Sequence, residues 1–191
     1  MPISGIFVLL IIIANFIISY KGFTNNQFFE GYKFEVEKIL LYKDYKRLVT
    51  SGFLHVGWMH LIFNMWSLYA FSGVVGAVLG GFGFLLIYFA SLIGGDLFSL
   101  FVHRNHGDYS SVGASGAVCG VMFASVALFP GMPILFFVPA WLYAILFVGF
   151  TIYGIRSGKN NVGYESHLAG ALIGMLLALV MHPASFLENY V

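Results

Sequence analysis

Gly113-Ala114-Ser115-Gly116 heads an apolar segment of the chain, and a later apolar segment carries His167. Polar and ionisable side chains are costly at membrane depth, and where they occur they usually mark a functional site. A serine hydroxyl and a histidine imidazole are also the smallest set that supports nucleophilic catalysis, because the imidazole can accept the proton of the attacking hydroxyl. The stretch therefore raises the question of whether Ser115 and His167 meet inside a membrane.

The composition is that of a polytopic membrane protein. Of the 191 residues, 60% are hydrophobic and only 9% are charged, whereas soluble domains carry about 25% charged residues. The net charge of +1 argues against a nucleic-acid partner. The chain has a single cysteine, Cys119, so it cannot form an intrachain disulfide.

Six segments are apolar enough to predict membrane-spanning helices, since a span needs about 20 largely apolar residues. They cover approximately residues 3–20, 57–74, 81–102, 113–129, 134–155 and 166–182. The first segment lacks a basic leader and a small-residue cleavage site, so we interpret it as a span rather than a removable signal. We expect an all-α polytopic membrane protein, with one domain over residues 1–191 built as a six-transmembrane-helix bundle.

Residues 21–54 form the one long connection between these segments. This connection mixes aromatic and aliphatic residues with Lys and Glu, so it is too polar to span a membrane and too aromatic to be a free linker. A partly helical segment lying on the membrane interface is the form we expect.

Small residues recur at helical spacing in the two segments that carry Ser115 and His167. They are Gly113, Gly116, Ala117, Gly120 and Ala124 in the first segment, and Gly170 and Gly174 in the second. Such stripes let two membrane helices approach closely. Packing the two stripes together would bring Ser115 and His167 into contact, although such stripes also serve ordinary helix packing.

His60 and Asn64 are four residues apart, so they share one face of the second predicted helix. Both side chains can donate hydrogen bonds to a developing oxyanion, together with the backbone N–H of Ser115. The alternatives are a packing role for His60 and an interhelical hydrogen bond for Asn64.

Three motifs together resemble the signature of the rhomboid family of intramembrane serine proteases. They are His55-x4-His60-x3-Asn64, Gly113-Ala114-Ser115-Gly116 and His167-Leu168-Ala169-Gly170-x3-Gly174. The resemblance covers nearly the whole chain, in the compact six-helix form typical of bacteria. It implies that Ser115 is the nucleophile and His167 the general base.

The same resemblance implies oxyanion-hole roles for His60, Asn64 and the Ser115 N–H, and structural roles near the site for a further set of residues. That set comprises His55, Gly113, Gly116, Cys119, Gly170 and Gly174.

Bacterial relatives often carry a tyrosine that stacks on the histidine where this chain has Cys119. The pair Lys46-Arg47 replaces a Trp-Arg pair, and Ser166 replaces an alanine. None of these departures removes a reacting group, so we expect activity, with His167 held more loosely.

The remaining polar residues do not extend this set. Glu165 lies two residues before His167, and residues at that spacing do not face each other on a helix. We interpret Asp96 as a polar contact that closes the bundle, and His103-Arg104-Asn105-His106 as a polar loop without a metal ligand set. We expect no metal and no cofactor.

Topology and partners follow from the resemblance. Lys and Arg are concentrated in the first, third and fifth connections, which the positive-inside rule alone would place in the cytoplasm. Rhomboid proteases open their active site outward, and we follow that orientation, in a bacterial inner membrane with the site on the periplasmic side. The implied partners are transmembrane protein substrates and the lipid bilayer. A substrate would enter beside residues 134–155, beneath a cap formed by residues 156–163.

Three other functions fit parts of this pattern. The first is a catalytically silent rhomboid-like protein that binds membrane clients. The second is a haem protein with His60 and His167 as axial ligands, which a Soret band would reveal. The third is a transporter or channel, but the chain lacks the paired intramembrane charges that such proteins often carry.

Overall fold

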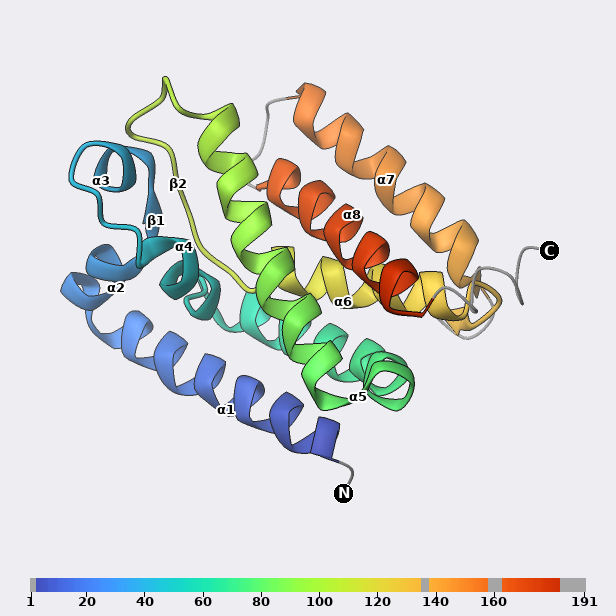
Figure 1. Cartoon of the computed structure of the whole chain (residues 1–191). Helices are drawn as coiled ribbons and strands as arrows, with labels where there is room; N and C mark the ends of the chain where they lie inside the picture. The colour runs from blue at the N-terminus through green and yellow to red at the C-terminus, as the bar shows by residue number, and fades with distance from the viewer. Residues whose placement is uncertain (1–2, 135–137, 158–162, 183–191) are drawn as a thin grey trace.

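The computed structural model of this protein describes residues 3–134, 138–157 and 163–182. Its long helices are α1 (Ile3–Thr24), α5 (Trp58–Val102), α6 (Ser115–Leu128), α7 (Ala140–Ser157) and α8 (Tyr164–Met181) (Figure 1). All of these except α6 are long and apolar enough to cross a membrane. The predicted helical membrane fold is therefore confirmed, whereas the count of six spanning helices is not.

Helix α5 contains two of the predicted segments in one element. A straight helix of 45 residues would be about 67 Å long, more than twice the thickness of the hydrocarbon core. At Gly80 the backbone leaves helical geometry, with φ 71° and ψ −178°, and this divides α5 into two arms. Figure 1 shows the arms, teal and green, meeting at a sharp turn. The loop expected between segments 57–74 and 81–102 is thus reduced to one glycine, because a glycine adopts a positive φ without steric cost.

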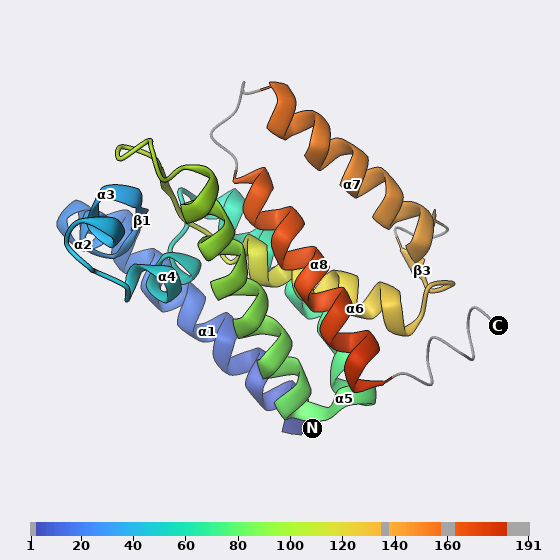
Figure 2. The same ribbon diagram turned by 45° about the horizontal axis from the view of Figure 1, so that its top comes forward.

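Helix α6 is the interior element of the bundle. It has 14 residues, and every one from Gly116 to Leu128 is buried. At about 21 Å it is shorter than the hydrocarbon core. It packs between α5 and α8, which Figures 1 and 2 show on either side of it. The first residue of this short, enclosed helix is Ser115.

The chain between α1 and α5 folds into a compact layer. Its elements are α2 (Asn26–Tyr32), β1 (Phe34–Glu35), α3 (Val36–Leu40), α4 (Arg47–Thr50) and a 3₁₀ turn (Ser51–Phe53). β1 pairs antiparallel with β2 (Ser110–Ser111), which lies just ahead of α6. Arg47 is buried inside the layer and donates to the carbonyl oxygens of Glu30 and Lys33. The layer is partly helical, and its position at the membrane interface stays a prediction.

Helix α7 lies at the edge of the bundle (Figures 1 and 2). It follows the short strands β3 (Pro133–Ile134) and β4 (Val138–Pro139), which pair antiparallel. The helix therefore begins six residues later than the predicted segment 134–155. Its outer face is apolar, with Ile145, Leu146 and Phe150 all well exposed, as expected for side chains that meet lipid.

Candidate active site

Ser115 and His167 lie within hydrogen-bond distance of each other. Their side chains come from the first residue of α6 and the first turn of α8, and 2.7 Å separates His167 Nε2 from Ser115 Oγ. Both side chains are partly buried and line the same cavity. The structure therefore brings together the two groups that the sequence analysis paired across 52 residues.

Glycines allow α6 and α8 to approach backbone to backbone. A Cβ added at Gly170 would overlap the carbonyl oxygen of Gly116, and one added at Gly174 would overlap that of Gly120. Two larger residues at these crossings would push the helices apart and separate the two reactive side chains. The small-residue stripes thus have a specific geometric role in this fold.

Gly113 shapes the chain immediately before Ser115. Its φ of +133° is a conformation that other residues rarely adopt. A Cβ at this position would lie 2.8 Å from His60 Cε1 and 3.6 Å from Ser115 Oγ. The Gly113 N–H also donates to the carbonyl oxygen of Ser51 at 3.0 Å. Only glycine leaves the space in which the His60 imidazole approaches the serine.

His60 and Asn64 face the same cavity from the first arm of α5. The Nε2 edge of the His60 ring lies beside Gly113, next to Ser115, whereas its Nδ1 is buried and has no hydrogen-bond partner in the described part of the chain. Asn64 Nδ2 donates to the His60 carbonyl oxygen at 2.9 Å, and an amide carries a second hydrogen that can still be donated. The first turn of α6 adds backbone N–H groups, which have no intrahelical acceptors at a helix N-terminus. These donors surround the Ser115 side of the cavity.

His55 supports His60 from the chain ahead of α5. Its ring is fully buried and meets the His60 ring edge to face, with centroids 4.8 Å apart. Burial, together with the neighbouring His60, lowers the pKa of His55 to about 3, so the ring is neutral at pH 7. The Ser19 hydroxyl donates to the Phe53 carbonyl oxygen, so the His55 Nδ1–H is the donor in the 2.9 Å contact with Ser19.

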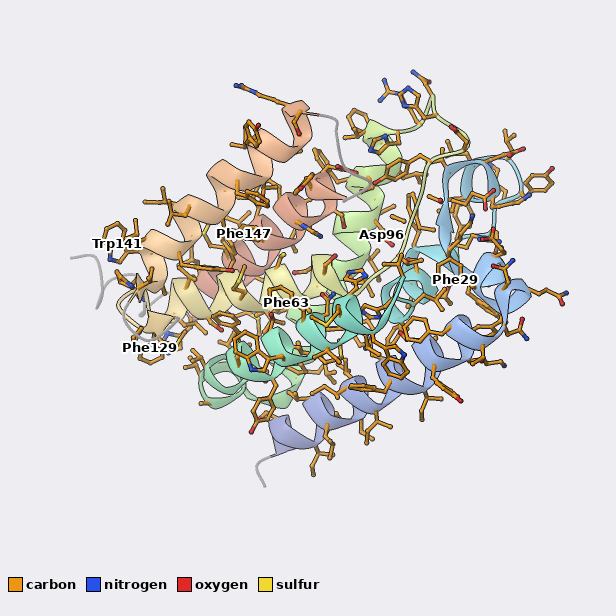
Figure 3. All side chains as sticks on the ribbon, turned by 180° about the vertical axis from the view of Figure 1, so that it is seen from behind. Phe29, Phe63, Asp96, Phe129, Trp141 and Phe147 are labelled. Atoms are coloured by element: carbon orange, nitrogen blue, oxygen red, sulfur yellow. The ribbon has the colours of Figure 1, made fainter. Side chains whose placement is uncertain are left out.

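A cavity of about 650 Å³ extends from the serine and histidine in two directions. One part is apolar and lined by side chains of α5, α6 and α7, and the other reaches the folded layer at Phe29, Glu30 and Lys33. Figure 3 labels Phe29, Phe63 and Phe147, which come from three different elements of this lining. The cavity therefore has two parts: an apolar wall that suits an apolar segment, and a polar rim.

Cys119 lines this cavity one turn beyond Ser115. An aromatic ring nevertheless meets His167, from Tyr164 on its own helix, with centroids 6.2 Å apart at 78°. The Tyr164 ring also fills the space that a side chain at Gly154 of α7 would need. The sequence analysis missed Tyr164, although its position three residues before His167 was a usable signal.

The other polar residues make structural contacts. Asp96 Oδ2, labelled in Figure 3, lies 2.8 Å from Ser51 Oγ and joins the folded layer to α5. His103 Nε2 lies 2.9 Å from the carboxylate of Glu165. The expected cap over residues 156–163 falls mostly on residues 158–162, which lie outside the described residues.

The family model for the Rhomboid domain matches residues 42–184. The chain belongs to the rhomboid family. Rhomboid protein 1, mitochondrial, of Saccharomyces cerevisiae is 33% identical over 157 residues, which cover 76% of this chain and 45% of that protein. Rhomboid-like protein 11, chloroplastic, of Arabidopsis thaliana is 32% identical over 163 residues, covering 76% of this chain and 57% of that protein. Rhomboid protease GluP of Bacillus subtilis is 28% identical over 179 residues, covering 92% of this chain and 34% of that protein.

This rhomboid chain spans about half the length of the curated relatives it matches, or less. Members of the family are generally intramembrane serine proteases, and two bacterial relatives are named as a rhomboid protease and a putative one. An integral membrane protein of the rhomboid family is thus supported. The expected location in a bacterial inner membrane and the expected compact bacterial type are not supported, because the relatives include mitochondrial and chloroplastic proteins.

Proposed function

We propose that this rhomboid protein is an intramembrane serine endopeptidase that cuts transmembrane segments of other membrane proteins with a Ser115–His167 dyad. The observation that carries the proposal is the 2.7 Å contact between His167 Nε2 and Ser115 Oγ at the wall of the cavity. Catalysis of this kind requires the nucleophile and its base to lie within hydrogen-bond reach of each other.

In the proposed reaction, His167 Nε2 accepts the hydroxyl proton as Ser115 Oγ attacks the scissile carbonyl carbon. The negative charge that develops on the carbonyl oxygen is stabilised by the Ser115 N–H and by donors from His60 and Asn64. His167 then returns the proton to the leaving amine as the peptide C–N bond breaks. Water, activated by the same imidazole, hydrolyses the resulting Ser115 ester and regenerates the free hydroxyl.

The cavity accounts for how such a reaction could proceed at membrane depth. Water can reach the dyad from the polar rim at Glu30 and Lys33, and a substrate segment can rest on the apolar wall at Phe147. A regular helix hides its carbonyl groups in hydrogen bonds to residues four positions away, so the substrate must unwind locally before attack. This favours substrates with a helix-destabilising stretch near a small residue. The outward-facing orientation of the site remains part of the proposal.

Fluorophosphonate labelling tests the proposal directly. The purified protein should gain one adduct, localised to Ser115 by mass spectrometry, and should cleave a model transmembrane substrate. Ser115→Ala should lose both properties while remaining folded in detergent. Ser157→Ala on α7 is the matched control and should retain both, because its hydroxyl bonds locally to the Gly154 carbonyl oxygen and does not line the cavity among the described residues. Cleavage by Ser115→Ala at the parental rate would show that the dyad is wrong. A folded parent that neither labels nor cleaves would favour a silent client-binding protein.

A further inference from the structure

A second cluster of titratable side chains surrounds the Glu165 carboxylate, outside the reacting groups. Glu165 Oε1 lies 2.6 Å from Tyr109 Oη, 2.9 Å from His103 Nε2 and 3.4 Å from Ser99 Oγ. Glu165 is buried, with only 8% of its surface exposed. A buried carboxylate is costly unless donors compensate its lost hydration, so three donors converging on one oxygen form a built site.

The two strongest donors are held in place by each other. The rings of His103 and Tyr109 stack in parallel, with centroids 3.6 Å apart and an interplanar angle of 7°. Burial and the hydrogen bond to Glu165 raise the pKa of Tyr109 well above its usual range, so its hydroxyl remains a donor at every working pH. The donors therefore present a preformed cradle to the carboxylate.

The cluster connects the chain segments that carry the two dyad residues. Glu165 lies in the first turn of α8, two residues before His167. Tyr109 directly precedes β2, which leads through Gly113 to Ser115, and its carbonyl oxygen accepts from the Val36 N–H of the folded layer. One carboxylate thus ties the start of α8 to the strand that leads into α6.

Glu165 cannot act as the third member of a triad. Residues two positions apart point to different sides of a helix, and the partners of the Glu165 carboxylate lie on α5 and in the chain before β2 rather than on His167. Any effect on His167 must therefore pass through the position of the first turn of α8. The turn of α8 that follows is constrained by the close contact of Gly170 with the Gly116 backbone of α6.

We propose that Glu165 is a positioning residue for the dyad: by binding Tyr109 and His103, it fixes the rotation and depth of the first turn of α8, and so holds His167 Nε2 at Ser115 Oγ. The inference rests on the proposed proteolytic function. The carboxylate replaces, at longer range, the orienting acid that serine hydrolases often place directly on the histidine. A misplacement of about 1 Å can cost about 10²-fold in rate, so loss of this anchor affects turnover more than substrate binding.

The test compares Glu165→Ala, Glu165→Gln and Tyr109→Phe with the parent in detergent, with kcat and KM for a model transmembrane substrate. Glu165→Ala should lower kcat by about 10²-fold with KM nearly unchanged, and should slow fluorophosphonate labelling of Ser115 in parallel. Glu165→Gln retains an acceptor oxygen for Tyr109 and should restore most of the rate. Glu37→Gln, in α3 of the folded layer, is the matched control and should leave kcat unchanged.

A double-mutant cycle separates positioning from general damage to the fold. Glu165→Ala and Tyr109→Phe both remove the same contact, so their effects on kcat should be clearly non-additive in the double variant. Additive effects, parental kcat in Glu165→Ala, or a rise in KM alone would overturn the inference. If Glu165→Ala fails to fold, Tyr109→Phe decides the question: a lower kcat at unchanged KM supports the inference, and a parental kcat overturns it. If the parent neither cleaves nor labels, the proposed function fails instead, which is a distinguishable result.

Discussion

The two sides of the cavity are packed in opposite ways. On one side α6 and α8 cross with backbone against backbone, and a Cβ at Gly170 or Gly174 would overlap a facing carbonyl oxygen. On the other side α7 buries only Ala140, Thr151 and Gly154 among the described side chains of the helix. The dyad lies on the tightly packed side, and α7 forms a wall with one face on the cavity and an exposed apolar face on the outside.

The difference separates two requirements of an enzyme that acts within a membrane. Reacting groups must be held to a fraction of an ångström, which close interdigitated packing achieves because it has no space to relax into. A substrate segment must also reach them, and a wall with little buried surface can move at low cost. Under the proposed function, the two requirements would fall on different helices: α6 and α8 would hold the reacting groups, and α7 would admit the substrate.

Gly170→Val should produce the largest effect. The added side chain overlaps the Gly116 backbone, so α8 must move away from α6 and the Ser115–His167 contact should be lost. We expect cleavage to be abolished and the free energy of unfolding to fall by at least about 1–3 kcal/mol. Thermal unfolding and turnover in detergent measure both quantities.

Gly149→Val on α7 is the control for that variant, because nothing lies within 4 Å of a Cβ at Gly149. It should leave stability and turnover near the parental values. Equal damage from the two valines would remove the distinction between the two sides of the cavity.

Asn64→Ala should give the next largest effect and extends the comparison to the α5 wall. Loss of one oxyanion-hole donor typically lowers turnover by about 10²–10³-fold. We expect a loss of this size in kcat, with fluorophosphonate labelling slowed but not abolished. Parental turnover with reduced stability would instead show that Asn64 has a structural role, through its hydrogen bond to the His60 carbonyl oxygen.

Cys119→Tyr probes the looser side from α6. Because Cys119 lines the cavity opposite Tyr143 and Phe147, we expect the new ring to enter that space, with a stability loss below about 1 kcal/mol. Substrate binding should suffer instead, seen as a higher KM. A large fall in melting temperature would show that this side is packed as tightly as the α6–α8 contact.

His55 should have little effect on stability at neutral pH and should be visible as a pH dependence of stability below it. Its pKa is about 3 in the folded protein, against an ordinary value of 6.5. Below pH 6.5 the unfolded chain binds a proton that the folded chain does not, so stability falls as the pH drops from 6.5 towards 3. At pH 5.5 the loss is about 1.4 kcal/mol. Unfolding measured between pH 7.5 and 5.5 should show a shallower slope for His55→Asn, and an unchanged slope would contradict the assignment.

Several features of the fold escaped the sequence because they depend on partners distant in the chain. Gly80 lies in the connection expected between two spans and is followed by Gly81, but the sequence did not show that the break would be confined to one residue of an otherwise continuous helix. The pairing of β1 with β2 joins residues more than 70 positions apart. The Glu165 cluster was overlooked because spacing along one helix indicates only which residues face each other on that helix, not what packs against them.

The sequence by itself determined that this is a helical membrane protein of the rhomboid family, and which serine and histidine to pair. Hydropathy and glycine spacing are local patterns, and they constrain any fold the chain can adopt. Only the tertiary structure decided that α6 is short and enclosed, that Ser115 begins it, and that Tyr164 rather than residue 119 meets the His167 ring. These outcomes depend on which surfaces the helices present to one another, and that is settled by packing across the whole bundle.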